Sequence, residues 1–434
     1  MNYSRREQTG WYYYDWANSA FSTTVVTLFL GPYLTELAKA AADAHGYVHP
    51  FGIPVDARAW WGYLVSLSVA SQVIFLPVLG AMADYSPRKK TLLAVFAYAG
   101  AIPTVAMYWL EGQAYLAGGA LFLAANLAFG ASCVIYNSYL PQIAPPEERD
   151  AVSSKGWGIG YLGGGLLLAL NLALYMKADA LGLTEGQAVR ISLASAGVWW
   201  AGFTAIPLLA LRGRKPALEL PPGMSYAAAG FRQIFRTLGE LRHYPQALLF
   251  LAAYLIYNDA IQAVITLATQ FGSDELKIPL SMLTLAILMV QFVAFFGALG
   301  FNQLARAIGA KRSVMAALVL WTAVLVAMYG WVRTTAQFFA VAAVVALVLG
   351  GSQALSRSLF SLMIPQGKEA EYFGIYEISD KGTSWLCPLL FGLALQFSGS
   401  YRLAVLSLVV FFALGLALLA MVDVRRAAAQ AANG

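Results

Sequence analysis

Long apolar segments, separated by short polar loops, follow one another along almost the whole chain. A helix that crosses a bilayer needs roughly 20 consecutive apolar residues, and these segments reach about that length. Spans can be placed at about residues 11–36, 59–83, 91–110, 114–140, 151–176, 189–211, 245–271, 279–305, 313–332, 336–362, 373–398 and 401–422. The pattern therefore predicts an all-α membrane protein with twelve transmembrane helices.

The composition excludes an ordinary soluble domain. Hydrophobic residues make up 59% of the 434 residues and charged residues only 12%, whereas soluble domains carry about 25% charged residues. The two cysteines, Cys133 and Cys387, both lie in apolar segments. With so few cysteines, neither a disulfide framework nor a cysteine metal site is expected.

Basic residues concentrate in the loops on one side of the predicted spans. The loops on the side of the N-terminus carry Arg88, Lys89, Lys90, Arg149, Lys155, Arg212, Arg214, Lys215, Arg232, Arg236, Arg242, Arg306, Lys311, Arg312, Lys368 and Arg425. Since cytoplasmic loops are enriched in lysine and arginine, we expect both termini to be cytoplasmic. This bias also accounts for the formal net charge of +6 without a nucleic-acid partner.

The two halves of the chain contain matching short stretches. Residues 83–90 (ADYSPRKK) align with 305–312, Pro141-Gln142 with Pro365-Gln366, and 153–156 (SSKG) with 379–382 (SDKG). Their order and spacing are those of a duplicated six-helix unit. We therefore predict an N-terminal bundle at 1–211, a cytoplasmic linker at 212–244 and a C-terminal bundle at 245–434.

A duplicated twelve-span chain with a basic central loop resembles the major facilitator superfamily of secondary transporters. Residues 80–90 (GAMADYSPRKK) are similar to its loop motif between spans two and three, with Pro87 where glycine is usual. The resemblance implies two pseudo-symmetric bundles and alternating access, and it gives Asp84 and Arg88 a role in the cytoplasmic gate. In the second copy Arg306 stands in place of the acid, so a matching latch is not implied there.

Two further stretches resemble one branch of that superfamily. Residues 14–21 (YDWANSAF) and 350–358 (GGSQALSRS) are similar to signatures of the autophagy-related vacuolar amino-acid effluxers and their bacterial relatives. The resemblance implies efflux of a small solute, an amino acid being the first candidate and drugs or other metabolites the alternative. It also implies a monomer in a bacterial cytoplasmic membrane, with protons as a candidate coupling ion and no cofactor.

Polar side chains recur at helical spacing within the spans, which predicts inward-facing stripes. In the first span Asp15, Asn18, Ser19 and Ser22 share one face of an α-helix. The candidate substrate-binding or coupling residues are Asp15, Asn18, Ser22, Asn126, Tyr136, Asn137, Asn258, Asp259, Gln262, Gln353, Arg357 and Trp385. Ionisable groups inside a membrane are costly and usually functional.

Arg357 is the only arginine predicted to lie well within a span. Its planar guanidinium could hold the carboxylate of a substrate in two hydrogen bonds. It could also control the protonation of Asp15 or Asp259, or close a permanent ion pair between the bundles. Asp259 is a candidate proton site or an acid kept ionised by Arg357, and Asp15 could line the cavity or cap a helix start.

Three charged residues near the start of span eleven form a second candidate gate. Glu377, Asp380 and Lys381 have the spacing of a local ion network, for which gating and plain solvation are both open. The histidines His45, His49 and His243 lie outside the spans, and no nucleophile paired with a base is visible. We therefore expect a transporter and neither an enzyme nor a metal site, with a receptor or scaffold as the alternative of another class.

Overall fold

The structure is a computed structural model that describes residues 3–433 except 215, 217, 241–242 and 382–385. Among the described residues, ten helices are long and apolar enough to cross a membrane. Two further spans each comprise more than one described helix. The first passes from an α-helix into a π-helix, and the eleventh consists of two helices on either side of residues 382–385.

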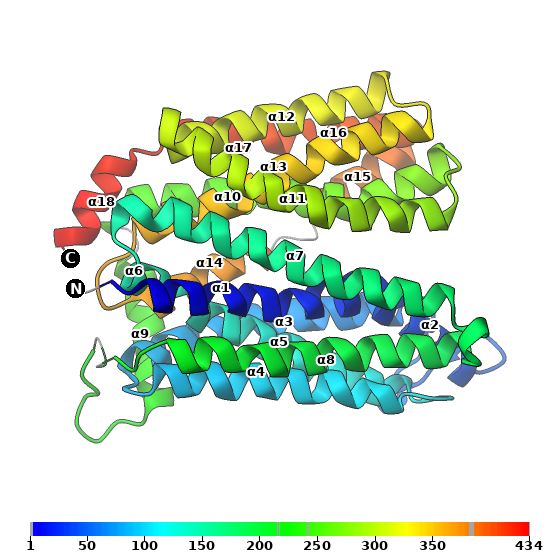
Figure 1. Cartoon of the computed structure of the whole chain (residues 1–434), viewed down its shortest axis with the longest axis horizontal. Helices are drawn as coiled ribbons and strands as arrows, with labels where there is room; N and C mark the ends of the chain where they lie inside the picture. Colours follow the sequence, from blue (N-terminus) through cyan, green and yellow to red (C-terminus); the bar gives the residue numbers. More distant parts are fainter. Residues whose placement is uncertain (1–2, 215, 217, 241–242, 382–385, 434) are drawn as a thin grey trace.

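Helices of the N-terminal half follow the order predicted from the apolar pattern (Figure 1). They are α1 (Arg5–Ala20), the π-helix η1 (Phe21–Phe29), α2 (Leu30–Ala41), α3 (Trp60–Tyr85), α4 (Lys89–Ala106), α5 (Tyr115–Asn137), α6 (Leu140–Ile143), α7 (Arg149–Met176) and α8 (Glu185–Ala210). Short 3₁₀ turns are η2 (Pro50–Gly52), η3 (Met107–Trp109), η4 (Pro146–Glu148) and η5 (Asp179–Leu181). The loop before α3 holds an antiparallel pair of two-residue strands, β1 (Tyr47–Val48) and β2 (Val55–Asp56).

Helix α9 (Tyr226–Glu240) lies between the two halves in sequence. The C-terminal half contains α10 (Pro245–Gln270), the π-helix η7 (Phe271–Glu275), α11 (Leu280–Ile308), α12 (Ala310–Gly330), α13 (Thr335–Ser361), α14 (Glu369–Lys381), α15 (Leu386–Ser398), α16 (Tyr401–Ser407), α17 (Val409–Met421) and α18 (Val424–Asn433). Both termini and α9 lie at the same end of the molecule, and α9 runs across the transmembrane helices (Figure 1). We call this end the terminal end.

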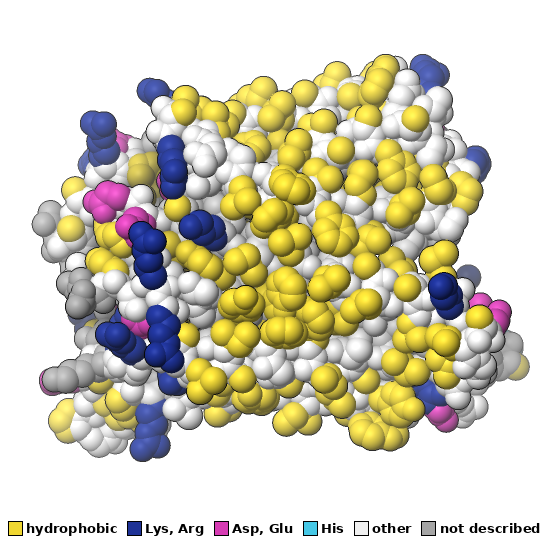
Figure 2. All heavy atoms as spheres, in the orientation of Figure 1, with side chains coloured by type: hydrophobic (Ala, Val, Ile, Leu, Met, Phe, Trp, Pro, Cys, Tyr) yellow, Lys and Arg dark blue, Asp and Glu magenta, His cyan; other side chains and the backbone are white. Residues whose placement is uncertain are grey.

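Each half of the chain has a hydrophobic core of its own. One is built almost entirely from residues 11–211 around Trp11 and Trp200, and the other from residues 247–427 around Phe250 and Trp321. The outer surface is apolar over the middle of the molecule, and lysine and arginine gather mainly at the terminal end (Figure 2). Twelve spans in two bundles confirm the fold class predicted from the sequence.

The π-helix in the first span changes which polar residues share a face. Side chains of Asp15, Asn18 and Ser19 lie on α1, which ends at Ala20, while Ser22 already belongs to η1. A π-helix has more residues per turn than an α-helix, so the regular spacing expected for this face does not continue past Phe21. Ser22 turns its hydroxyl back to the carbonyl oxygen of Ser19.

Candidate substrate and gating site

Arg357 lies within α13 and is almost completely buried, with 2% of the residue exposed. Its Nη1 and Nη2 each donate to Oδ2 of Asp15 in α1 at 3.2 Å. Nε donates to Oγ of Ser153 at 2.9 Å, Nη2 to the carbonyl oxygen of Ser153 at 3.0 Å, and Nη1 to Oδ1 of Asn137 at 3.2 Å. An arginine has five N–H donors, so these five hydrogen bonds occupy all of them.

Aromatic rings surround this guanidinium. Its central carbon lies 4.7 Å from the ring centroid of Trp11, 5.4 Å from that of Trp157 and 5.6 Å from that of Tyr136. The hydroxyl of Tyr136 also donates to Oδ2 of Asp15 at 2.7 Å. Cation–π contacts of this kind stabilise a desolvated cation, so Arg357 remains charged at low cost while paired with Asp15.

Gly156 allows α7 to approach the ion pair. A Cβ atom at this position would lie 2.8 Å from Oδ2 of Asp15 and 3.1 Å from Nη2 of Arg357. Such contacts are too short for a side chain, so only glycine fits here without displacing the pair. Close helix packing is the role expected of small residues within a membrane span.

The polar network continues from Arg357 through Asn137 of the N-terminal half to a second residue of the C-terminal half. Asn137 donates from Nδ2 to Oε1 of Glu377 at 3.0 Å. Gln353 lies on the same helix as Arg357. It donates to Oδ1 of Asn258 at 2.7 Å and accepts from the hydroxyl of Tyr254 at 3.2 Å. Residues from α1, α5, α10, α13 and α14 thus contribute polar side chains to the contact region between the halves.

Asp259 lies apart from Arg357. Its Oδ2 accepts the backbone N–H of Cys387 at the start of α15, at 2.9 Å. Arg357 pairs with Asp15 in α1. Of the acids that the sequence offered as partners of Arg357, the structure therefore selects Asp15.

A second set of contacts joins the halves at the terminal end. Asp84, at the end of α3, accepts the backbone N–H groups of Ala370 and Glu371, in the first turn of α14, at 3.0 and 2.9 Å. Lys89 forms an ion pair with the same carboxylate at 3.2 Å. A carboxylate at a helix N-terminus is favourable because the unpaired N–H groups and the helix dipole both attract it. We call these contacts the Asp84 latch.

Glycines let α3 and α14 approach closely beside the latch. A Cβ atom at Gly80 would lie 2.2 Å from the carbonyl oxygen of Ala370, and one at Gly374 would lie 2.8 Å from that of Leu76. Two more contacts cross between the halves nearby. Arg149 donates to the carbonyl oxygen of Ser361 at 2.7 Å, and Ser358 donates to Asp150 at 2.5 Å.

Helix α9 covers the latch. Gln233 donates to Oε2 of Glu371 at 3.4 Å and accepts the hydroxyl of Tyr85 at 3.0 Å. Glu371 precedes the predicted span, and burial raises its pKa from 4.5 to about 7, with the nearby Asp84 acting in the same direction. Hydrogen bonding by Thr237 opposes this increase. The closed latch therefore favours a protonated Glu371.

Several predicted residues lie outside these two clusters. Asn18 contacts the sulfur of Cys133 at 3.7 Å, and Asn126 donates to Ser68 of the neighbouring helix α3 at 2.7 Å. Gln262 is partly buried on α10. Trp385 and the side chains of Asp380 and Lys381 lie outside the described part of the structure.

The basic partner in the latch differs from the one implied by the family resemblance. Arg88 has an exposed side chain, and its backbone N–H bonds to Oγ of Ser86. The next residue, Lys89, is buried and holds Asp84. Arg357 also contacts Ser153, Trp11 and Trp157, which the sequence did not predict because nothing in their spacing marks a contact across the bundles.

Solved structures with the same fold are transporters. A bacterial homologue of the iron transporter ferroportin in the outward-facing state aligns with a TM-score of 0.67 and 14% identity, covering 96% of this chain and 98% of that one. The proton:xylose symporter XylE aligns with a TM-score of 0.71 and 13% identity, covering 96% and 95%. These likenesses support the two-bundle fold of the major facilitator superfamily.

Relatives by sequence extend over nearly the whole chain. An uncharacterized MFS-type transporter of Bacillus subtilis, YxiO, is 29% identical over 96% of this chain and 95% of its own length. Autophagy-related protein 22-1 of Aspergillus niger is 25% identical over 98% of this chain and 89% of its own length. Together with the fold and a buried ion pair between the bundles, these relatives define a membrane transporter of the major facilitator type and not an enzyme. Within that class the chain belongs to the family described as vacuole effluxer Atg22 like, which matches residues 3–432.

Proposed function

We propose that this transporter moves a small solute with a carboxylate group, an amino acid being the first candidate, by proton-coupled alternating access. The observation that carries the proposal is the complete use of the Arg357 donors, two of them by Asp15. Since every donor is in use, a substrate carboxylate must displace a present partner, and we propose that it displaces Asp15, the carboxylate among them. Planar, two-pronged binding of carboxylates is the interaction for which arginine is best suited.

Replacement of Asp15 suggests how a proton would be coupled to transport. Breaking a buried ion pair costs several kcal/mol, roughly, unless both charges find new partners. A substrate carboxylate would neutralise Arg357, and a proton would neutralise Asp15, which retains the hydroxyl of Tyr136. The bundles could then separate without leaving an unpaired charge in the membrane. Loss of the substrate and the proton would restore the pair between α1 and α13.

The Asp84 latch supports assigning the described conformation to a state closed at the terminal end. The latch, the glycine contacts and the cover of α9 all lie at that end. We place this end in the cytoplasm because lysine and arginine gather there (Figure 2). In this proposal residues 1–211 and 245–434 are the two moving bodies and residues 212–244 are the cytoplasmic linker, in a monomer of a bacterial inner membrane.

A thermal-shift screen tests whether the protein binds an amino acid through its carboxylate. Purified protein is screened by thermal shift with amino acids and, as matched controls, with the corresponding amides that lack the carboxylate. A ligand that binds only the folded state raises the apparent melting temperature. We expect stabilisation by an acid and not by its amide, and loss of that difference in Arg357→Lys.

Flux measurements then separate a transporter of this substrate from a scaffold. Proteoliposomes loaded with a pH-sensitive dye report proton movement, while labelled substrate reports transport. Asp15→Asn should carry substrate without the proton or stop transport, and the exposed control Asp43→Asn should behave as wild type. Stabilisation only by carboxylate-free drugs would contradict the proposal and favour drug efflux, and binding without flux would favour a receptor.

A further inference from the structure

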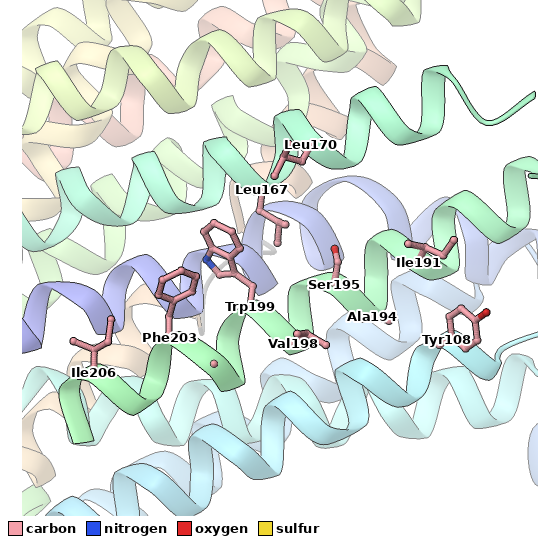
Figure 3. A pocket seen from close by; sticks show the side chains of 11 residues that line it. Tyr108, Leu167, Leu170, Ile191, Ala194, Ser195, Val198, Trp199, Phe203 and Ile206 are labelled. Carbon is pink, nitrogen blue, oxygen red and sulfur yellow. The ribbon is translucent and has the colours of Figure 1, made fainter. Parts of the chain in front are cut away.

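A groove opens on the lipid-facing side of the N-terminal half. It has a volume of about 820 Å³ and lies between α7 and α8, with Tyr108 at one end (Figure 3). Leu167 and Leu170 line it from α7, while Trp199 and Phe203 line it from α8. Nearly all of its lining is apolar, and the hydroxyl of Ser195 is turned to Asn171 of α7.

Small residues of α8 hollow out the groove between larger ones. Gly202 and Ala194 lie on the lining, and a Cβ atom at Gly202 would meet no heavy atom within 4 Å. The indole of Trp199 is fixed, because Nε1 donates to the carbonyl oxygen of Trp16 at 3.1 Å. The shape of the groove therefore depends on the side chains of α8, among which Trp199 has a fixed position.

The groove continues into a second one at the terminal end. Ile206 lines both, and the second groove, of about 470 Å³, is formed by Arg5, Arg6, Thr9 and Gly10 of α1 with the end of α8. Gly10 brings these helices together, since a Cβ atom there would lie 2.2 Å from Cβ of Ala210. The two arginines are thus held over one end of a long apolar groove.

Within the described part of the chain, neither Arg5 nor Arg6 has a hydrogen-bonded or ion-paired side-chain partner, and both are exposed. The neighbouring acids are already engaged. Glu7 is buried, bonding to Nη2 of Arg214 and to the backbone N–H of Arg212, and Glu148 accepts from Gln8. The positive charges of Arg5 and Arg6 are therefore available to bind an anionic lipid headgroup at the terminal end.

We propose that this combined groove binds one anionic phospholipid of the leaflet at the terminal end. The phosphate lies at Arg5 and Arg6, and an acyl chain lies along α8 over Trp199 and Phe203. The lining of α8 from Ile191 to Ile206 is roughly 22 Å long at about 1.5 Å per residue. One leaflet supplies about 15 Å, half of a hydrocarbon core of roughly 30 Å, so an acyl chain of that leaflet fits within the groove without filling its whole length.

Charge and shape both distinguish this occupant from the lipids that surround any membrane protein. A zwitterionic lipid would gain little from two arginines, whereas each basic residue near an anionic headgroup strengthens binding. A chain in the groove would also contact both α7 and α8, and not a single helix. This inference does not depend on the proposed substrate or on the coupling mechanism.

The test uses the full-length protein in detergent with equal amounts of phosphatidylglycerol and phosphatidylcholine that have identical acyl chains. Native mass spectrometry measures which lipid is retained. We expect wild type to retain one phosphatidylglycerol in preference, and the double variant Arg5→Gln, Arg6→Gln to lose roughly tenfold or more of that preference. Its melting temperature without lipid should be close to that of wild type, since neither side chain has a hydrogen bond or ion pair to a described residue.

A glycine pair tests the acyl-chain part of the site. Gly202→Leu should fill the groove and reduce retention of phosphatidylglycerol, while Gly300→Leu, an exposed glycine on α11 that also has open space, should not. Equal retention of both lipids by wild type would overturn the proposal. So would an unchanged preference in the double arginine variant, or equal effects of the two glycine substitutions.

Discussion

Arg357 of α13 and Asp15 of α1 form a buried ion pair across the two bundles, in which two guanidinium nitrogens donate to one carboxylate oxygen at 3.2 Å. The hydroxyl of Tyr136 reaches the same oxygen at 2.7 Å. The two charged residues are 342 positions apart in the sequence. In the proposed alternating access the two bundles separate, so the partners of both charges would change with the conformation.

The shape of the guanidinium should matter more than its charge. We predict that Arg357→Lys folds with a melting temperature near that of wild type but loses most substrate binding, because lysine cannot clasp a carboxylate in two bonds. Arg357→Ala should lower stability by about 3–5 kcal/mol, since it leaves Asp15 unpaired. The measurement is ligand affinity beside melting temperature, with exposed Arg333→Lys as the control. Normal affinity in the Arg357→Lys variant would show that the pair is only structural.

Gly80 should be required for closure of the terminal end. We predict that Gly80→Ala shifts the protein toward the state open at that end, because the new Cβ atom would lie 2.2 Å from the carbonyl oxygen of Ala370. Overpacking of this kind costs roughly 1–3 kcal/mol. Gly62→Ala is the matched control on the same helix, where a Cβ atom meets nothing within 4 Å. Double electron–electron resonance between spin labels on α3 and α14 reports the distance, and equal distances in both variants would count against the contact as a gate.

The Asp84 latch gives a separate prediction for the same gate. Asp84→Asn keeps the size of the side chain but removes the charge that binds Lys89 and two backbone N–H groups. The closed state should lose about 1.5–3 kcal/mol, the usual value for hydrogen bonds to a charged group. Arg88→Gln should leave the equilibrium nearly unchanged, because the side chain of Arg88 is exposed. Accessibility of single cysteines near α14 measures both, and a larger effect of Arg88→Gln would contradict the assignment to Lys89.

Closure should also depend on pH through Glu371. Burial raises the pKa of this acid from 4.5 to about 7 in the closed latch. A raised pKa means that the stabilising contribution is fully present below about 4.5 and is lost as the pH rises through about 7. Asp84, Lys368, Gln233 and Thr237 surround the group.

We therefore predict that the melting temperature falls between about pH 4.5 and pH 7 more steeply in wild type than in Glu371→Gln. The glutamine cannot ionise, so the difference between the two curves isolates this residue from other titrating groups. Glu219→Gln, an exposed position in the linker, should follow the wild-type curve. Parallel curves for wild type and Glu371→Gln would remove Glu371 from any account of the gate.

The orientation of the protein can be tested by labelling. We predict that an impermeant maleimide added outside intact cells modifies a cysteine placed at His45 and spares one placed at Arg232, because the basic loops should be cytoplasmic. Background labelling should be low, since the native Cys133 and Cys387 are both buried. Modification of position 232 with protection of position 45 would reverse the topology.

Much of this protein was determined by the sequence alone. Hydropathy and helical spacing act along the chain, so they predicted the twelve spans, the all-α fold and the polar character of α1, α10 and α13. The distribution of lysine and arginine also predicted an orientation, which the labelling experiment tests. The stretches at 14–21 and 350–358 led to the family that the full-length match then established.

The tertiary structure decided which of these residues meet. Sequence left Asp15 and Asp259 open as partners of Arg357, and packing of α7 against both α1 and α13 selected Asp15. It likewise placed Lys89 against Asp84 where the family resemblance implied Arg88. The physical reason is that an ion pair depends on the distance between two atoms across a helix interface. That distance is fixed by the packing of both bundles, including glycines such as Gly80 and Gly156. It cannot be predicted from the periodicity of a single segment.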